Sequence, residues 1–164
     1  TLTQVQGIFS AYMRCRGYTV ADDVVHDIYE RTGGHAGLVN LCGKAIDEEI
    51  RTRTRTDGNS LTLPTWLWTL RRRLETWLTD FPTVKRLVQD LVENDELRFS
   101  CRSALSDLFL CCHGAVPTES LDSPVRDFLM SVGMVREVEP GKLCLSNSMV
   151  RMLAIWQIVP VDRR

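Results

Sequence analysis

The chain has 164 residues, of which 44% are hydrophobic and 25% are charged. These proportions are those of a globular protein, so they exclude a disordered or fibrous chain. Its 20 Lys and Arg residues against 21 Asp and Glu residues leave a net charge of -1, which gives no global electrostatic reason to bind nucleic acid or an anionic membrane.

Residues 1–50 are expected to form a helical subdomain. Apolar residues recur at spacings of three and four, which is the pattern of helices with one buried face, over residues 3–16, 21–31 and 35–50. Thr3 is expected to cap the first of these helices, and Gly17 is expected to end it.

Residues 51–61 interrupt this pattern and predict a loop or linker. Arg51, Arg53 and Arg55 alternate with threonine, apolar anchors are missing, and the segment ends in turn residues. Residues 62–80 then predict a helix that connects two subdomains.

Residues 81–160 predict a winged helix-turn-helix. Helices are expected over 82–93, 103–112 and 123–132, with a short strand at 96–99 and a turn at 113–117. Two short apolar runs around a Pro-Gly turn predict a β-hairpin over 134–145, and a last helix over 148–158 follows. The fold class is therefore mainly α, with a small β-hairpin near the end.

Six cysteines are present, and none belongs to a CxxC pair. They fall mostly on apolar faces of the expected helices and strands, so free thiols in a reducing, intracellular compartment are expected (cytoplasm or nucleus). No apolar run approaches the roughly 20 residues of a membrane span, and no signal peptide is evident. We expect no membrane association, and we expect the chain to be a piece of a longer protein.

The segment from Asp27 to Leu41 reads D-I-Y-E-R-T-G-G-H-A-G-L-V-N-L. It resembles the lid signature of AAA+ and STAND-type P-loop ATPases, in which a helix, T-G-G-x-P and a second helix follow the nucleotide-binding core. The resemblance places Gly33, Gly34, His35 and Ala36 at a turn against the nucleotide; Ala36 stands where the family usually has proline. Glycines permit close backbone approach, and helix N-terminal amides favour anions.

The remainder is similar to the winged helix of archaeal-type STAND ATPases, in residues 130–135 and 143–148. The whole chain resembles the corresponding part of Crinkler-type effectors of oomycetes and fungi, which would act inside a host cell. The resemblance implies a helical lid subdomain (1–50), a linker (51–61), a connecting helix (62–80) and a winged-helix subdomain (81–160). Such a module would relay nucleotide state to domain rearrangement or oligomerisation.

No catalytic residue is predicted, because the sequence contains neither G-x-x-x-x-G-K-[ST] nor an apolar strand ending in paired acids. We therefore expect a non-catalytic module, with ATP or ADP and magnesium held by an upstream ATPase core that would be its main partner. A second copy or a host protein is a further candidate partner.

Several alternatives remain open. The glycine turn can be a simple corner, and His35 can either donate to a phosphate or cap its helix. Arg71, Arg72 and Arg73 can contact DNA phosphates, meet an acidic surface of the core, or only face solvent. The alternative functions are a DNA-binding winged helix and an effector fragment that binds a host protein.

Specific DNA binding is not expected, because the helix over 124–132 has only Arg126 and Asp127 as charged residues among apolar ones. No metal site is expected either. His26 lies among acids on a helix that would face solvent, and the Cys111-Cys112-His113 run lacks a second pair of ligands.

Overall fold

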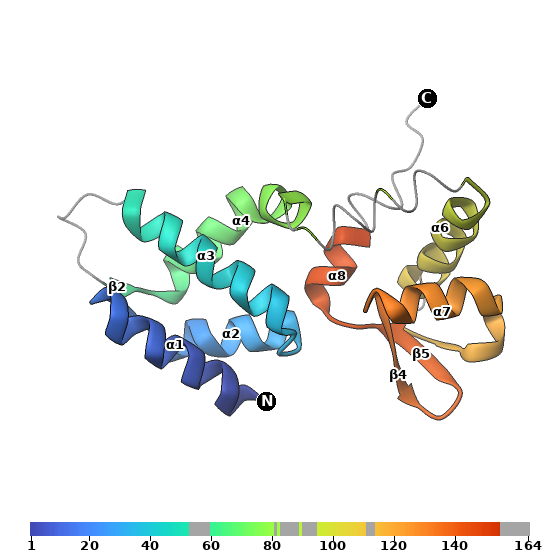
Figure 1. The fold of residues 1–164 in the computed structure, drawn as a ribbon, viewed down its shortest axis with the longest axis horizontal. Helices are drawn as coiled ribbons and strands as arrows, with labels where there is room; N and C mark the ends of the chain where they lie inside the picture. Colours follow the sequence, from blue (N-terminus) through green and yellow to red (C-terminus); the bar gives the residue numbers. More distant parts are fainter. Residues whose placement is uncertain (53–59, 81, 83–88, 90–94, 111–113, 155–164) are drawn as a thin grey trace. The chain divides into compact units, whose positions relative to one another are not determined.

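The computed structural model describes residues 1–52, 60–80, 82, 89, 95–110 and 114–154. The chain divides into two compact units, Thr1–Trp77 and Leu78–Arg164. Its described part is mainly α-helical and has a small antiparallel sheet that includes a hairpin towards the C-terminal end of the sequence (Figure 1). The predicted fold class is therefore confirmed.

The first unit begins with helix α1 (Leu2–Arg16). Thr1 and Gln4 form a capping box, in which the Thr1 backbone nitrogen donates to Gln4 Oε1 at 2.8 Å. The prediction that Thr3 caps this helix is wrong, because Thr3 already lies within it. Gly17 ends the helix as predicted, with a left-handed φ of 72°.

Helices α2 (Asp22–Thr32) and α3 (Ala36–Thr52) follow close to their predicted positions, and α2 packs against both α1 and α3. The apolar faces of the three helices meet in a common core, whose buried side chains are Val5, Phe9, Val24, Val25, Ile28, Leu38, Val39, Cys42, Ala45 and Ile46. Burying one large apolar side chain contributes about 1.5–3 kcal/mol, so this seam is a major source of the unit's stability.

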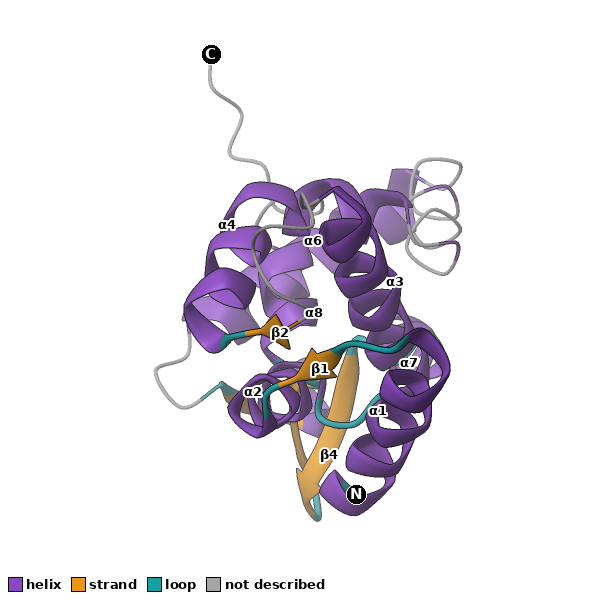
Figure 2. Cartoon of the chain, turned by 90° about the vertical axis from the view of Figure 1, so that its left-hand side faces the viewer, coloured by secondary structure: helices purple, strands orange, loops and turns teal. Residues whose placement is uncertain are grey.

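A parallel ribbon of two short strands was not anticipated by the sequence analysis. Strand β1 (Thr19–Val20) pairs with β2 (Ser60–Leu61), as Figure 2 shows. The loop predicted over 51–61 is therefore only partly right. Helix α3 continues to Thr52, β2 occupies the last two positions, and residues 53–59 lie outside the described residues.

Helix α4 (Leu63–Asp80) matches the predicted connecting helix. Trp66 is fully buried, and its Nε1 donates to Asp27 Oδ2 at 2.8 Å. Arg31 Nε donates to the same oxygen at 2.7 Å, so one carboxylate on α2 holds a side chain of its own helix and one of α4. This directional contact fixes α4 against α2.

The second unit contains helix α6 (Asp95–Leu110). The prediction of a strand at 96–99 is wrong, because these residues form the start of this helix, which begins before the predicted helix at 103–112. Four residues are too few to separate a helical from a strand pattern. The helix predicted over 82–93 lies mostly outside the described residues.

A three-stranded antiparallel sheet follows α6, with β3 (Ala115–Pro117), β4 (Val135–Glu139) and β5 (Lys142–Leu145) in the order β3-β5-β4. The hairpin β4–β5 confirms the prediction over 134–145. The turn expected at 113–117 is wrong for its last three residues, because they pair with β5 as β3.

A 3-10 turn (Thr118–Ser120) and helix α7 (Ser123–Ser131) separate β3 from β4, and α8 (Ser148–Leu153) follows β5. These elements enclose a second apolar core with the buried side chains Cys101, Leu105, Val116, Val125, Leu129, Met134, Leu143 and Met149. The rest of the helix predicted to residue 158 lies outside the described residues after Ala154.

The four described cysteines are free thiols, namely Cys15, Cys42, Cys101 and Cys144. Burial raises the pKa of Cys42 to about 12 and that of Cys101 to about 11. Among the described helices, none is both long enough and apolar enough to cross a membrane.

Candidate functional site

The glycine corner, which we define as Gly33, Gly34, His35 and Ala36, joins α2 to α3. Gly33 has a φ of 59° and Gly34 a φ of 74°, so two left-handed residues follow each other and turn the chain. Only glycine adopts this conformation at little cost, which explains why both positions lack a side chain. The structure brings the four predicted residues together on one exposed turn.

Thr32 holds the corner from its buried side. Its side chain is 1% exposed, and its Oγ1 donates to Ile28 O at 2.7 Å and accepts the Gly34 N–H at 3.2 Å. The His35 N–H donates to Thr32 O at 3.1 Å. Thr32 was not among the residues predicted from the sequence, although a threonine directly before paired glycines signals a side chain that bonds to a nearby backbone N–H.

The inner side of the corner is covered. A Cβ atom added to Gly34 would lie 3.2 Å from Tyr29 Cε2 and 3.9 Å from the backbone nitrogen of Thr1. The Tyr29 ring and the start of α1 therefore fill the space behind Gly34. A ligand can approach only the outer side, where Gly33, His35 and Ala36 are exposed.

His35 caps α3. Its Nδ1 accepts the Leu38 N–H at 3.4 Å, and its backbone oxygen accepts the Val39 N–H at 2.9 Å. The geometry therefore favours the capping role of the two roles considered from the sequence. With Nδ1 as an acceptor, the neutral ring carries its proton on Nε2, which leaves one donor for another group.

The N-terminus of α3 offers further donors. Within the described residues, the N–H groups of Ala36 and Gly37 have no hydrogen-bond partner. The aligned peptide dipoles of this 17-residue helix make its N-terminus favourable to anions. Because alanine replaces the proline of the resembled signature, position 36 keeps an N–H that proline lacks.

Arg71, Arg72 and Arg73 lie on α4 and do not form one cluster. Successive helical residues point about 100° apart, so the three neighbours cannot share one face, and Arg73 points away from the side that Arg71 and Arg72 share. Arg73 Nη1 lies 3.7 Å from Glu48 Oε2, and the Arg72 guanidinium lies 4.5 Å from the Trp68 ring centroid. The structure therefore shows no shared anion site formed by these three residues in the part of the chain that it describes.

Among the other charged or metal-like candidates from the sequence, those that the structure describes form no shared site. His26 is exposed, and no group of three or more His, Cys, Asp or Glu side chains that could hold a metal occurs in the described ranges. Arg51 pairs with Asp47. The remaining candidates, namely Arg53, Arg55 and the Cys111-Cys112-His113 run, lie outside the described residues.

Helix α7 packs against its own unit rather than presenting a basic face. Val125 is 5% exposed and Leu129 is fully buried. Arg126 Nε lies 3.0 Å from Asp127 Oδ1, so its charge is already partly compensated. These contacts give no support to base reading by this helix.

No protein-family model matches the chain, and neither a curated protein nor a solved structure matches it. The chemistry of the site therefore follows from its geometry alone. An exposed helix N-terminus, a spare imidazole donor and a backbone held by Thr32 suit an anionic group that approaches from outside.

Proposed function

We propose that the chain is the non-catalytic lid and winged-helix module of a nucleotide-dependent switch ATPase, with the glycine corner beside a nucleotide held by an upstream core. The observation that carries this proposal is the exposed start of α3, with its unpartnered Ala36 and Gly37 N–H groups in the described structure, directly after two left-handed glycines. The T-G-G-H sequence supports it through its resemblance to the ATPase lid.

The corner would sense a nucleotide rather than hold one. Hydrogen bonds from a neutral N–H to a charged group contribute about 1.5–3 kcal/mol each, and two of them give about 3–6 kcal/mol. Association itself costs about 4 kcal/mol or more. Binding therefore requires a phosphate-gripping loop elsewhere, which agrees with its absence from this sequence.

The position of α1 also supports the proposal. The nitrogen of Thr1 lies 3.9 Å from the site of a Gly34 Cβ atom, so polypeptide attached ahead of Thr1 would start next to the corner. In this proposal the upstream core is joined to the module on the covered side of the corner, directly behind Gly34.

A relay from the corner would pass through α2. This helix ends at the corner, and its Asp27 accepts the Trp66 indole N–H from α4. A displacement of α2 would therefore bias the position of α4, which is the element that continues into the second unit. Such coupled helix shifts are a common form of molecular switch.

The test uses the full-length protein that contains this chain. Ala36→Glu places a carboxylate on the exposed corner, where the start of a helix tolerates an acid well. We expect its affinity for ATP and ADP to fall about tenfold by charge repulsion, measured by isothermal titration calorimetry. Ala36→Gln, of equal size and without the charge, is the matched control and should bind nearly as well as the parent.

Two results would overturn the proposal. One is equal nucleotide affinity of the Glu and Gln variants. The other is a full-length reading frame that encodes no phosphate-gripping loop ahead of Thr1.

A further inference from the structure

The exposed side of α4 combines apolar and basic residues. We define the α4 face as Pro64, Leu67, Trp68, Arg71 and Arg72, which lie on one side of the helix at 100° per residue. Leu67 is 40% exposed and Trp68 is 52% exposed. The opposite side of the helix is buried in the first unit through Trp66, Leu70, Leu74 and Trp77.

The two arginines of the α4 face have no carboxylate partner among the described residues, whereas Arg16, Arg31, Arg51 and Arg73 each pair with one. Arg72 stacks on the Trp68 ring, and this contact leaves the N–H groups at the edge of the guanidinium available. Such an edge binds carboxylates in a two-pronged geometry. The face therefore fits a surface that carries both carboxylates and exposed apolar groups.

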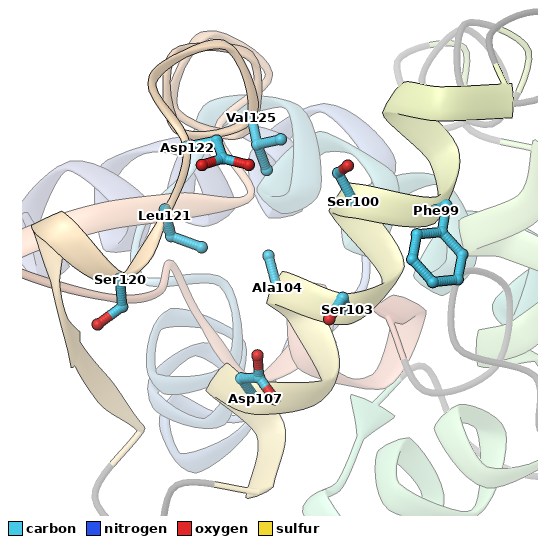
Figure 3. A pocket seen from close by; sticks show the side chains of 9 residues that line it. All are labelled: Phe99, Ser100, Ser103, Ala104, Asp107, Ser120, Leu121, Asp122 and Val125. Carbon is cyan, nitrogen blue, oxygen red and sulfur yellow. The ribbon is translucent and has the colours of Figure 1, made fainter.

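The second unit carries a surface of this kind, which we name the acidic hollow. It has a volume of about 200 Å³ and lies between α6 and residues 120–125 (Figure 3). Buried apolar side chains of Ala104, Leu121 and Val125 line it from within. Its exposed polar and acidic lining residues are Ser103, Asp107, Ser120 and Asp122.

Two properties make the acidic hollow complementary to the α4 face. Asp107 and Asp122 form no ion pair within the described residues. Phe99, which also lines the hollow, is 77% exposed. Carboxylates and an unburied aromatic ring on one surface thus correspond to guanidinium groups and unburied Trp and Leu side chains on the other.

We propose that the α4 face of one copy of this chain docks on the acidic hollow of a second copy. A nucleic acid or an unrelated acidic peptide would satisfy only the arginines, whereas a second copy satisfies both surfaces at once. The net charge of -1 adds little repulsion between copies. Because the two surfaces differ, the contact is head-to-tail and can extend beyond a dimer. It does not depend on the glycine corner meeting a nucleotide.

The test is sedimentation equilibrium of the 164-residue chain. The contact rests on few charges at an exposed surface, so we expect the average mass to rise between about 10 µM and about 500 µM protein at low salt. It should return towards the monomer value in about 0.5 M NaCl, because salt screens exposed charges.

Charge reversal makes the test specific. R71E/R72E should remain monomeric, because both of its surfaces are then acidic, and D107R/D122R should remain monomeric because both are basic. An equimolar mixture of the two should associate again, since every contact between unlike copies is then complementary. R14E/R136E changes the net charge by the same amount as R71E/R72E, at exposed residues that belong to neither surface, and should associate like the parent.

Circular dichroism of each variant checks that its helix content is unchanged. A parent chain that stays monomeric throughout the concentration range overturns the proposal. The same holds if the mixture of the two reversed variants stays monomeric, or if R71E/R72E associates as the parent does.

Discussion

The two units of the chain are held together by different kinds of contact. In the first unit, side-chain bonds join residues far apart in the sequence, as in the Trp66–Asp27 hydrogen bond and the Arg16–Asp47 ion pair. In the second unit, the side-chain hydrogen bonds of α7, of the β4–β5 hairpin and of the start of α8 join residues at most four apart. There, the backbone ladder of β3, β5 and β4 and the apolar core bring distant segments together.

This difference shows where the molecule specifies geometry most tightly. Apolar burial is non-directional, so it stabilises a unit without fixing one orientation of a helix. A hydrogen bond from a buried indole to a carboxylate fixes both distance and angle. The Trp66 indole and the Arg31 guanidinium both donate to Asp27 on α2, the helix that ends at the glycine corner, and these bonds help to fix the position of the corner.

The largest expected effect is on the stability of the first unit, and it tests whether the two units unfold independently. Trp66→Ala should lower the free energy of unfolding of the first unit by about 3–5 kcal/mol, because it leaves a cavity and removes a partner of Asp27. Urea denaturation followed by circular dichroism measures this loss.

Two further variants sharpen this result. Trp66→Phe keeps an aromatic ring but loses the indole N–H and part of the ring volume, so its cost should be smaller, at about 1–3 kcal/mol. Leu129→Ala is the matched change in the second unit, with an expected cost of about 2–5 kcal/mol. If Trp66→Ala and Leu129→Ala shift one common unfolding transition by additive amounts, the two units unfold as one. Their different kinds of contact then do not give them separate stabilities.

An intermediate effect is expected at the glycine corner. Gly34→Ala must adopt a φ of 74° and brings its Cβ to 3.2 Å from the Tyr29 ring, so it should destabilise the first unit by about 1–2 kcal/mol. Gly7→Ala is the control, because Gly7 lies within α1 with no atom near its Cβ position, and it should stabilise by about 0.5–1 kcal/mol. Thermal unfolding measures the change in Tm of each variant relative to the parent. A change of the same sign for both variants would contradict the described backbone conformation at Gly34.

The smallest effect concerns alkaline pH. The Cys42 thiol ionises near 9.0 in the unfolded chain, and burial raises its pKa to about 12 in the folded one. The unfolded state therefore loses its proton first, so this stability contribution is fully present below pH 9 and is lost as the pH rises towards 12. At pH 10 this should have removed about 1.4 kcal/mol from the free energy of unfolding.

Cysteine variants separate this contribution from others. Cys42→Ala should reduce the loss of stability between pH 8.5 and about pH 10 relative to neutral pH, whereas Cys15→Ala, at an exposed position, should leave it unchanged. Cys101 provides the corresponding thiol in the second unit, where burial raises the pKa to about 11. An identical pH profile for Cys42→Ala and Cys15→Ala would show that Cys42 is not sealed in the core.

The sequence predicted those features that leave a periodic or turn-specific pattern. Helices α1 to α4 follow their apolar spacings, the β4–β5 hairpin follows its Pro-Gly turn, and the corner follows its paired glycines. The β1–β2 ribbon escaped prediction, because two-residue strands carry no alternation and their pairing joins distant parts of the chain.

The bend at the glycine corner was predicted from the sequence, whereas the side chains that support it were not. The glycines signalled the bend, but the bonds of Thr32 and the ring of Tyr29 behind Gly34 depend on tertiary contacts. Arg71, Arg72 and Arg73 form one basic run in the sequence. In the helix, Arg71 is exposed, Arg72 stacks on Trp68, and Arg73 pairs with Glu48.

The closeness of Thr1 to Gly34 has a practical consequence for experiments on this protein. An affinity tag or fluorescent label joined ahead of Thr1 would be anchored directly behind Gly34, where it could disturb the packing that holds the corner. Labels for ligand titrations are better attached to exposed Cys15, which lies at the opposite end of α1.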